Sequence, residues 1–184
     1  MLLPASKYAR WSASIFSGQD KFHELFNPLT PGFVYATAND FDSVKSAVEQ
    51  NKVCAIMMEC VQGEGGVIAL DDNFVKSVYN LCQEKDIILI IDEVQTGNGR
   101  TGELYAYMNY GVTPDIVSTA KGLGGGLPIG ACVMNEKTAD VLGAGAHGST
   151  FGGNPYFIDL DKLHEKGLLT DVLKGMGKLS AEER

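Results

Sequence analysis

Short apolar runs alternate with amphipathic segments along the chain from about residue 40 onward, whereas residues 1–32 show no clear period. The runs are only a few residues long and rich in Val, Ile and Leu, which is typical of buried strands. Two of them carry an acidic residue at or next to their last position. The runs predict strands at 53–60, 87–92, 115–120 and 129–134.

Aspartates mark the expected starts of the two main helices. Asp40 can cap one helix, and Asp71 or Asp72 can cap a second, because a short acidic side chain accepts hydrogen bonds from the first free amides of a helix. The residues that follow place apolar side chains at helical spacing. A short helix is predicted over 136–142, and the apolar stripe within 156–184 predicts a helical tail.

Strands that alternate with helices are typical of an α/β protein with a mostly parallel sheet flanked by helices. Continuous apolar strands fit a sheet that is covered on both faces. In such sheets, ligand sites form at the carboxyl ends of the strands. Glu59, Asp92 and Lys121 all fall at or just beyond predicted strand ends. We therefore expect three separate segments of the chain to converge on one edge of the sheet.

Lys121 stands between a predicted strand and the glycine-rich stretch GLGGG. A surface lysine at the start of a loop is the simplest interpretation. The chemical interpretation is a lysine that forms a Schiff base with an aldehyde cofactor, since such an amine must be reachable and held on a firm element. The adjoining glycines would let the backbone turn tightly beside a bulky ligand.

Asp92 ends the apolar run IILIID. It can simply cap the turn that follows the strand. It can also face the ring nitrogen of pyridoxal phosphate (PLP), because a buried carboxylate favours the protonated pyridine that the cofactor needs to accept electrons.

The net charge of −8, from 15 basic and 23 acidic residues, argues against a nucleic-acid-binding surface or a basic membrane patch. No apolar run is long enough to cross a bilayer, and the first residues are too weakly apolar for a signal peptide. The cysteines form no C-x-x-C pair, so buried free thiols in a reducing cytoplasm are expected. They are Cys54, Cys60, Cys82 and Cys132.

Three other kinds of site are disfavoured. IILIIDE resembles a Walker B strand, but the chain has no G-x-x-x-x-G-K-[ST] loop to complete a nucleotide site. GNGRTG (97–102) matches G-x-G-x-x-G, but it does not directly follow its strand, as a dinucleotide-binding turn must. No metal site is expected, because the three histidines are scattered without ligand spacing.

Three segments together resemble the class III, PLP-dependent aminotransferases, and most closely the acetylornithine branch of that family. They are IILIIDEVQTGNGRTGELYAY, GVTPDIVSTAKGLGGGLPIGA and HGSTFGGNP, in the family's order. The resemblance implies PLP fold type I, with residues 1–155 as part of the PLP-binding large domain and 156–184 as a C-terminal helical tail.

The resemblance also implies roles at matching positions. Lys121 matches the lysine that forms the Schiff base and then shuttles a proton, and Asp92 the partner of the pyridine nitrogen. Val94 matches the residue that packs on the ring, Gln95 the amide near its phenolic oxygen, and Thr150 the threonine that reaches the phosphate in the neighbouring subunit. Glu59 and Glu64 match acids of a loop at the substrate pocket.

The implied activity is transfer of an amino group from an ω-amino donor such as N-acetylornithine to 2-oxoglutarate. The implied setting is a cytoplasmic homodimer in arginine biosynthesis. An alternative stays open, because the family's phosphate-binding turn and C-terminal domain have no counterpart here. The chain would then be a truncated fragment, catalytically impaired or inactive, of an ornithine, acetylornithine or 4-aminobutyrate type of aminotransferase.

Overall fold

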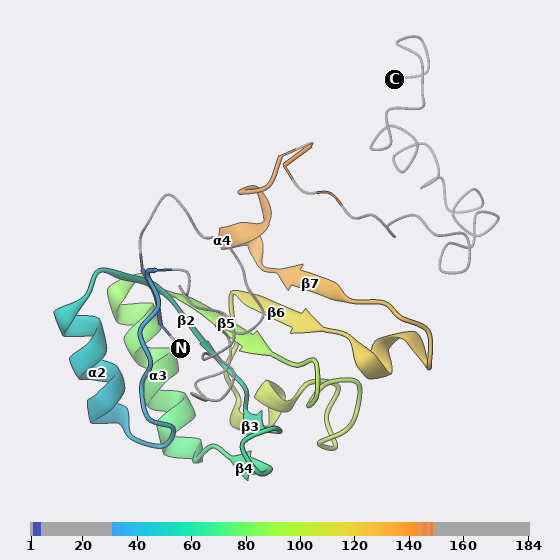
Figure 1. Cartoon of the computed structure of the whole chain (residues 1–184), viewed down its shortest axis with the longest axis horizontal. Helices are drawn as coiled ribbons and strands as arrows, with labels where there is room; N and C mark the ends of the chain where they lie inside the picture. The colour runs from blue at the N-terminus through green and yellow to red at the C-terminus, as the bar shows by residue number, and fades with distance from the viewer. Residues whose placement is uncertain (1, 5–30, 144, 147, 149–184) are drawn as a thin grey trace, which may run out of the picture. The chain divides into compact units, whose positions relative to one another are not determined.

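The computed structural model describes residues 2–4, 31–143, 145–146 and 148. The chain divides into two units, Met1–Thr138 and Ala139–Arg184. The first unit contains the sheet and the two main helices (Figure 1). The predicted helical tail lies outside the described residues, and the predicted boundary between 155 and 156 stays a prediction. Within the described part of the chain, no helix is both long and apolar enough to cross a membrane.

The two main helices begin where the aspartates predict. Helix α2 (Phe41–Gln50) starts after Asp40, whose Oδ1 accepts a hydrogen bond of 3.0 Å from the amide of Ser43. Helix α3 (Asp72–Lys85) starts after Asp71 and ends at a residue in the left-handed conformation, a common way to stop a helix. Both helices predicted from the sequence are confirmed. Helix α4 (Glu136–Ala139) is shorter than the predicted segment.

The strands form a five-stranded sheet in the order β1-β2-β5-β6-β7. The pairs β2–β5 and β5–β6 are parallel, whereas β1 and β7 pair antiparallel with their neighbours. All four predicted strands are confirmed, each slightly shorter than its apolar run; β1 was not predicted. The strands are β1 (Leu2–Pro4), β2 (Val53–Met58), β5 (Ile88–Asp92), β6 (Ile116–Thr119) and β7 (Ala131–Met134).

Shorter elements occupy the loops that follow the strands. After β2, the chain forms a two-stranded antiparallel ribbon of β3 (Val61–Gln62) and β4 (Ile68–Ala69). Two 3-10 helices, η3 (Ala106–Tyr110) and η4 (Lys121–Gly124), lie before and after β6. The loops between the parallel strands are therefore ordered segments with their own hydrogen bonds.

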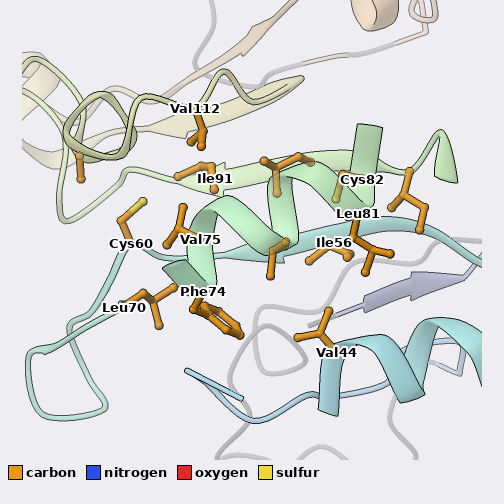
Figure 2. Packing of buried hydrophobic residues seen from close by; sticks show 14 residues of the cluster. Val44, Ile56, Cys60, Leu70, Phe74, Val75, Leu81, Cys82, Ile91 and Val112 are labelled. Atoms are coloured by element: carbon orange, nitrogen blue, oxygen red, sulfur yellow. The ribbon is translucent and has the colours of Figure 1, made fainter. Parts of the chain in front are cut away.

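The apolar stripe of α3 packs against the sheet at the centre of the core, as Figure 2 shows. Val75, Val78, Leu89 and Ile91 are fully buried. Burying an aliphatic side chain of this size contributes about 1.5–3 kcal/mol, so this contact is a main source of stability. Strand β7 is different, because its first three residues are exposed.

Asp115 fastens three strands at the end of the sheet opposite to the carboxyl ends of β5 and β6. Its Oδ2 accepts from the amide of Leu89 in β5, and its Oδ1 accepts from Nδ2 of Asn135, just after β7, both at 2.8 Å. The Asp115 side chain is almost fully buried. A buried carboxylate needs such donors. Asp115, at the start of β6, therefore links β6 to β5 and to the end of β7, and we call this set of contacts the Asp115 clasp.

Candidate functional site

Three parallel strands bring the predicted residues to one edge of the sheet. Asp92 is the last residue of β5 and pairs in register with Ser118 of β6. Lys121 follows the end of β6 by two residues, and Glu59 directly follows β2. The charges of Asp92 and Lys121 both act on the Glu59 carboxyl. The predicted convergence of the three segments is thus present in the structure.

The Asp92 carboxylate is held on one of its two oxygens. Its Oδ1 accepts from the amide of Val94 at 2.9 Å and from Oγ of Ser118 at 3.1 Å. Within the described residues, both hydrogen bonds to this carboxylate end on Oδ1, so Oδ2 is available to another group. A half-buried carboxylate fixed in this way can stabilise a cationic donor placed at the strand end.

Lys121 is an exposed lysine on a constrained backbone. It is the first residue of η4, and its φ of 45° lies in the left-handed region that residues with a Cβ rarely adopt. The carbonyl of the preceding residue, Ala120, accepts from the amide of Leu123 at 3.0 Å. Backbone strain of this kind concentrates at functional sites. The amine can reach a ligand while the backbone beneath it stays fixed.

Glu59 is a half-buried carboxyl within the same group of residues. Its Oε2 accepts from the amide of Gly63 at 3.4 Å. Burial raises the pKa of Glu59 above its ordinary value, the Gly63 amide opposes this, and the Asp92 charge adds to the increase. The Lys121 charge lowers the pKa of Glu59, whereas the charge of Glu64 raises it. Burial is the largest of these causes, so the protonated form is favoured more than in water.

The loop after β2 also touches the loop after β5. A Cβ on Gly63 would lie 2.2 Å from Nε2 of Gln95, so only glycine leaves room for the Gln95 side chain in this position. Gln95 and Glu64 are exposed, and Val94 is half-buried. Of the predicted site residues, these stand on the loops beside Asp92. Thr150 lies outside the described residues.

Some side chains that shape this edge were not predicted from the sequence. Ser118 holds Asp92, and Asn98 donates to the backbone just before Lys121. Glu93 is fully buried and accepts from the hydroxyl of Thr96 and, at 2.9 Å, from the amide of Tyr107. Alternation along the strands could have placed Ser118 opposite Asp92, but no sequence pattern pointed to the other two.

The fold and this edge define an α/β protein with a carboxylate and a lysine at the ends of neighbouring parallel strands. The family model described as "Aminotransferase class-III" matches residues 11–160. The chain therefore belongs to the class III aminotransferases, as its sequence motifs predict.

Known members of the family are similar over most of this chain. Acetylornithine aminotransferase of Haemophilus ducreyi is 55% identical over 168 residues, which are 89% of this chain and 42% of that protein. Succinylornithine transaminase of Salmonella typhi is 51% identical over 138 residues, 75% of this chain and 34% of that protein. The chain thus spans less than half the length of these relatives.

A solved structure shares the fold. The ornithine aminotransferase of Toxoplasma gondii, crystallised in the presence of oxidised glutathione and reported with partial occupancy of PLP at its active site, superimposes with a TM-score of 0.71. Its sequence is 35% identical, and the match covers 85% of this chain and 41% of that one. The α/β architecture of PLP fold type I, predicted from the sequence, is therefore confirmed.

Proposed function

We propose that this protein acts in PLP-dependent transamination, moving an amino group from an ornithine-type donor such as N-acetylornithine to 2-oxoglutarate. The observation that carries the proposal is the placement of Asp92 at the end of β5 and of Lys121 just beyond the end of the neighbouring parallel strand β6. Oδ2 of Asp92 accepts no hydrogen bond from the described residues. The acetylornithine and succinylornithine relatives support this class of donor. A cytoplasmic homodimer, with Thr150 serving the neighbouring subunit, is part of the proposal.

The residues at this edge fit the cofactor. Lys121 would hold its aldehyde carbon, Asp92 its ring nitrogen, Val94 one ring face and Gln95 the phenolic oxygen. When bound, PLP withdraws electrons from the bond that is broken at the carbon bearing the transferred amino group. The fit rests on Oδ2 of Asp92, which accepts no hydrogen bond from the described residues. A carboxylate with one oxygen already bonded can present the other to one cationic nitrogen.

Each residue of the proposed site has one task. Asp92 keeps a proton on the ring nitrogen, and Ser118 fixes the carboxylate so that it does not turn away. Lys121 would hold the aldehyde carbon, and its Nζ, when free, would accept and return a proton. General acid–base transfer of this kind contributes typically 10²–10⁴-fold to a rate, roughly, when the amine is well positioned.

Glu59 and Glu64 are proposed to face the donor. They stand on the loop after β2, next to Asp92 and Gln95. A carboxylate here can pair with a cationic group of the donor or with a basic side chain, and a protonated Glu59 can donate a hydrogen bond. The raised pKa of Glu59 supports the second role.

The first experiment tests covalent attachment of the cofactor. The full 184-residue chain is incubated with PLP, reduced with borohydride, and digested for mass spectrometry. The adduct should lie on Lys121, disappear in Lys121→Ala, and remain in the control Lys85→Ala, which removes an exposed lysine of α3. Labelling spread evenly over exposed lysines would contradict the proposal and favour the alternative of an inactive fragment.

A second measurement tests the donor. A chain loaded with PLP should release the aldehyde product from N-acetylornithine in a single turnover, and should need 2-oxoglutarate for further turnovers. Lysine labelling without any such release would leave the cofactor site in place but contradict the proposed donor.

A further inference from the structure

We propose that Asn98 is a positioning residue for the site lysine: its side-chain amide fixes the backbone that carries Lys121. The inference rests on the proposed function, because it assigns Asn98 to the lysine that would bind the aldehyde. It goes beyond that function because the residue that fixes the backbone of Lys121 stands in a different loop, the one that follows β5.

The contacts of Asn98 converge on the residues directly before Lys121. Its Nδ2 donates to the carbonyl oxygen of Ala120 and to Oγ1 of Thr119, each at 3.2 Å. Thr119 is buried, so its hydroxyl is a fixed anchor rather than a mobile surface group. The Ala120 carbonyl also accepts from the amide of Leu123. The Ala120 carbonyl oxygen therefore links Asn98 to the turn in which Lys121 lies.

Asn98 also packs against the residue that follows the lysine. A Cβ on Gly122 would lie 3.3 Å from the Cβ of Asn98, closer than most real contacts of this kind. Glycine at position 122 therefore lets the asparagine approach the turn. Asn98 contacts the chain both before and after Lys121, and so encloses the one residue that must adopt a φ of 45°.

The loop that holds Asn98 is itself firmly anchored. Gly97 donates its amide to the carbonyl of Glu93 at 2.9 Å, and a Cβ on Gly97 would lie 2.7 Å from that same oxygen. Gly99 donates to the carbonyl of Leu104 at 3.2 Å. Asn98 has a φ of 59°, a conformation that asparagine tolerates better than most residues. The amide is therefore presented from a loop with little freedom.

These contacts have a consequence for the proposed chemistry. A lysine with four methylene groups can swing widely, so its reactive position depends on where its backbone starts. Lys121 is exposed and stands on a left-handed backbone that its own Cβ disfavours. Without the two hydrogen bonds from Asn98, the turn is held only by its local bonds, and the amine would sample a wider space.

The test uses two variants that remove the donor and keep the backbone. Asn98→Gly suits a positive φ and has no side chain, and Asn98→Asp keeps the size but cannot donate to the Ala120 carbonyl. Asn39→Gly is the matched control. Asn39 lies in the loop before α2 and has a φ of 60°. Its Nδ2 donates a hydrogen bond of 3.4 Å to the carbonyl oxygen of Ala69.

Two readouts are compared in the full chain. The first is hydrogen exchange at the Leu123 amide, measured without cofactor. It should be faster in both Asn98 variants, because the Ala120 carbonyl that it bonds is no longer held. The second is PLP labelling of Lys121 relative to Lys85 in the same sample. It should fall by up to about a hundredfold, the cost of misplacing a reacting group by roughly 1 Å, and Asn39→Gly should change neither readout.

The two readouts separate the failure of this inference from that of the proposed function. Exchange and labelling that stay at the wild-type level in either Asn98 variant would overturn the positioning role. If the wild-type chain shows no preference for Lys121, the proposed function fails, and the exchange of Leu123 alone still decides whether Asn98 fixes the turn.

Discussion

The Glu59 carboxyl illustrates how a single residue links burial to pH dependence. Burial raises the pKa of Glu59, so the folded protein binds its proton more readily than the unfolded chain does. The stabilising effect of the protonated Glu59 is therefore complete below the ordinary pKa of 4.5. It is lost as the pH rises through the raised pKa of Glu59 in the folded protein. The residue should make the fold less stable at neutral pH than it is in mild acid.

Glu59→Gln should remove this pH dependence, because the amide stays neutral at every pH and can still accept from the Gly63 amide. The melting temperature of the variant should equal or exceed that of the wild type near neutral pH, and the difference should shrink as the pH falls toward 4.5. Thermal unfolding followed by circular dichroism over this range is the measurement. Glu64→Gln, an exposed neighbour, is the control.

An equal shift in the Glu64 variant would mean that the effect comes from the net charge of the loop and not from the buried position of Glu59. The role given to Glu59 would be contradicted if the wild-type melting temperature rose steadily from pH 4.5 to 7 and Glu59→Gln showed the same pH dependence.

The sequence was informative for site residues that stand at the ends of strands. Asp92 and Lys121 could be placed at one edge because parallel strands share a direction and their apolar runs end there. Asn98 could not be placed, since its role depends on a turn that folds its amide onto a segment 21 and 22 positions later. Such contacts leave no periodic pattern in the sequence.

At the level of elements, Glu93 joins the loop after β5 to helix η3. Its carboxylate accepts from Thr96 within the loop and from the amide of Tyr107 in η3, and none of its side chain is exposed. A buried carboxylate of this kind is costly unless donors surround it. The contact therefore stabilises the arrangement of the two elements beside Asp92.

Glu93→Ala should destabilise the fold by roughly 1–3 kcal/mol, because it leaves the donors of Thr96 and Tyr107 without an acceptor. Glu93→Gln should cost less, since its carbonyl oxygen can still accept from Tyr107. Urea unfolding of both variants measures the difference, with Glu103→Ala, at an exposed position, as the control. Equal losses in Glu93→Ala and Glu93→Gln would show that charge, rather than hydrogen bonding, is what this position supplies.

The helices were easier to predict than the smaller elements. Both α2 and α3 follow an aspartate and have a clear apolar face, and these signals are local, although only Asp40 makes a side-chain capping hydrogen bond. Strand β1 has only three residues and pairs with β2, about 50 positions away, so no local signal announces it. The ribbon of β3 and β4 has only two residues in each strand, too few to show an alternating pattern.

At the scale of the whole molecule, the buried cysteines report on the integrity of the unit Met1–Thr138. Cys60 and Cys82 have no exposed surface, and burial raises the pKa of each thiol to about 12. At pH 8, only about one such thiol in ten thousand is ionised, and the thiolate is the reactive form. Cys132, in β7, is exposed and Cys54 is only partly buried, so the expectation of buried thiols is wrong for these two.

A thiol reagent at pH 8 should therefore modify Cys132 promptly, and Cys60 and Cys82 only when the unit unfolds. Mass mapping over time, with and without urea, measures the three rates. Labelling of Cys82 as fast as Cys132 in the absence of urea would mean that the core around α3 opens on its own. Cys132→Ser, at the exposed position, should leave the two slow rates unchanged.

The clasp formed by Asp115 has a consequence for how such a protein can change over evolutionary time. It links β5, β6 and the end of β7 at one end of the sheet, while the residues of the proposed site lie at the opposite end. Substitutions of exposed residues in the loops of the proposed site, such as Gln95, would then leave the links made by Asp115 intact. The protein can tolerate change at the proposed site because the Asp115 contacts and the proposed site residues lie at opposite ends of the same strands.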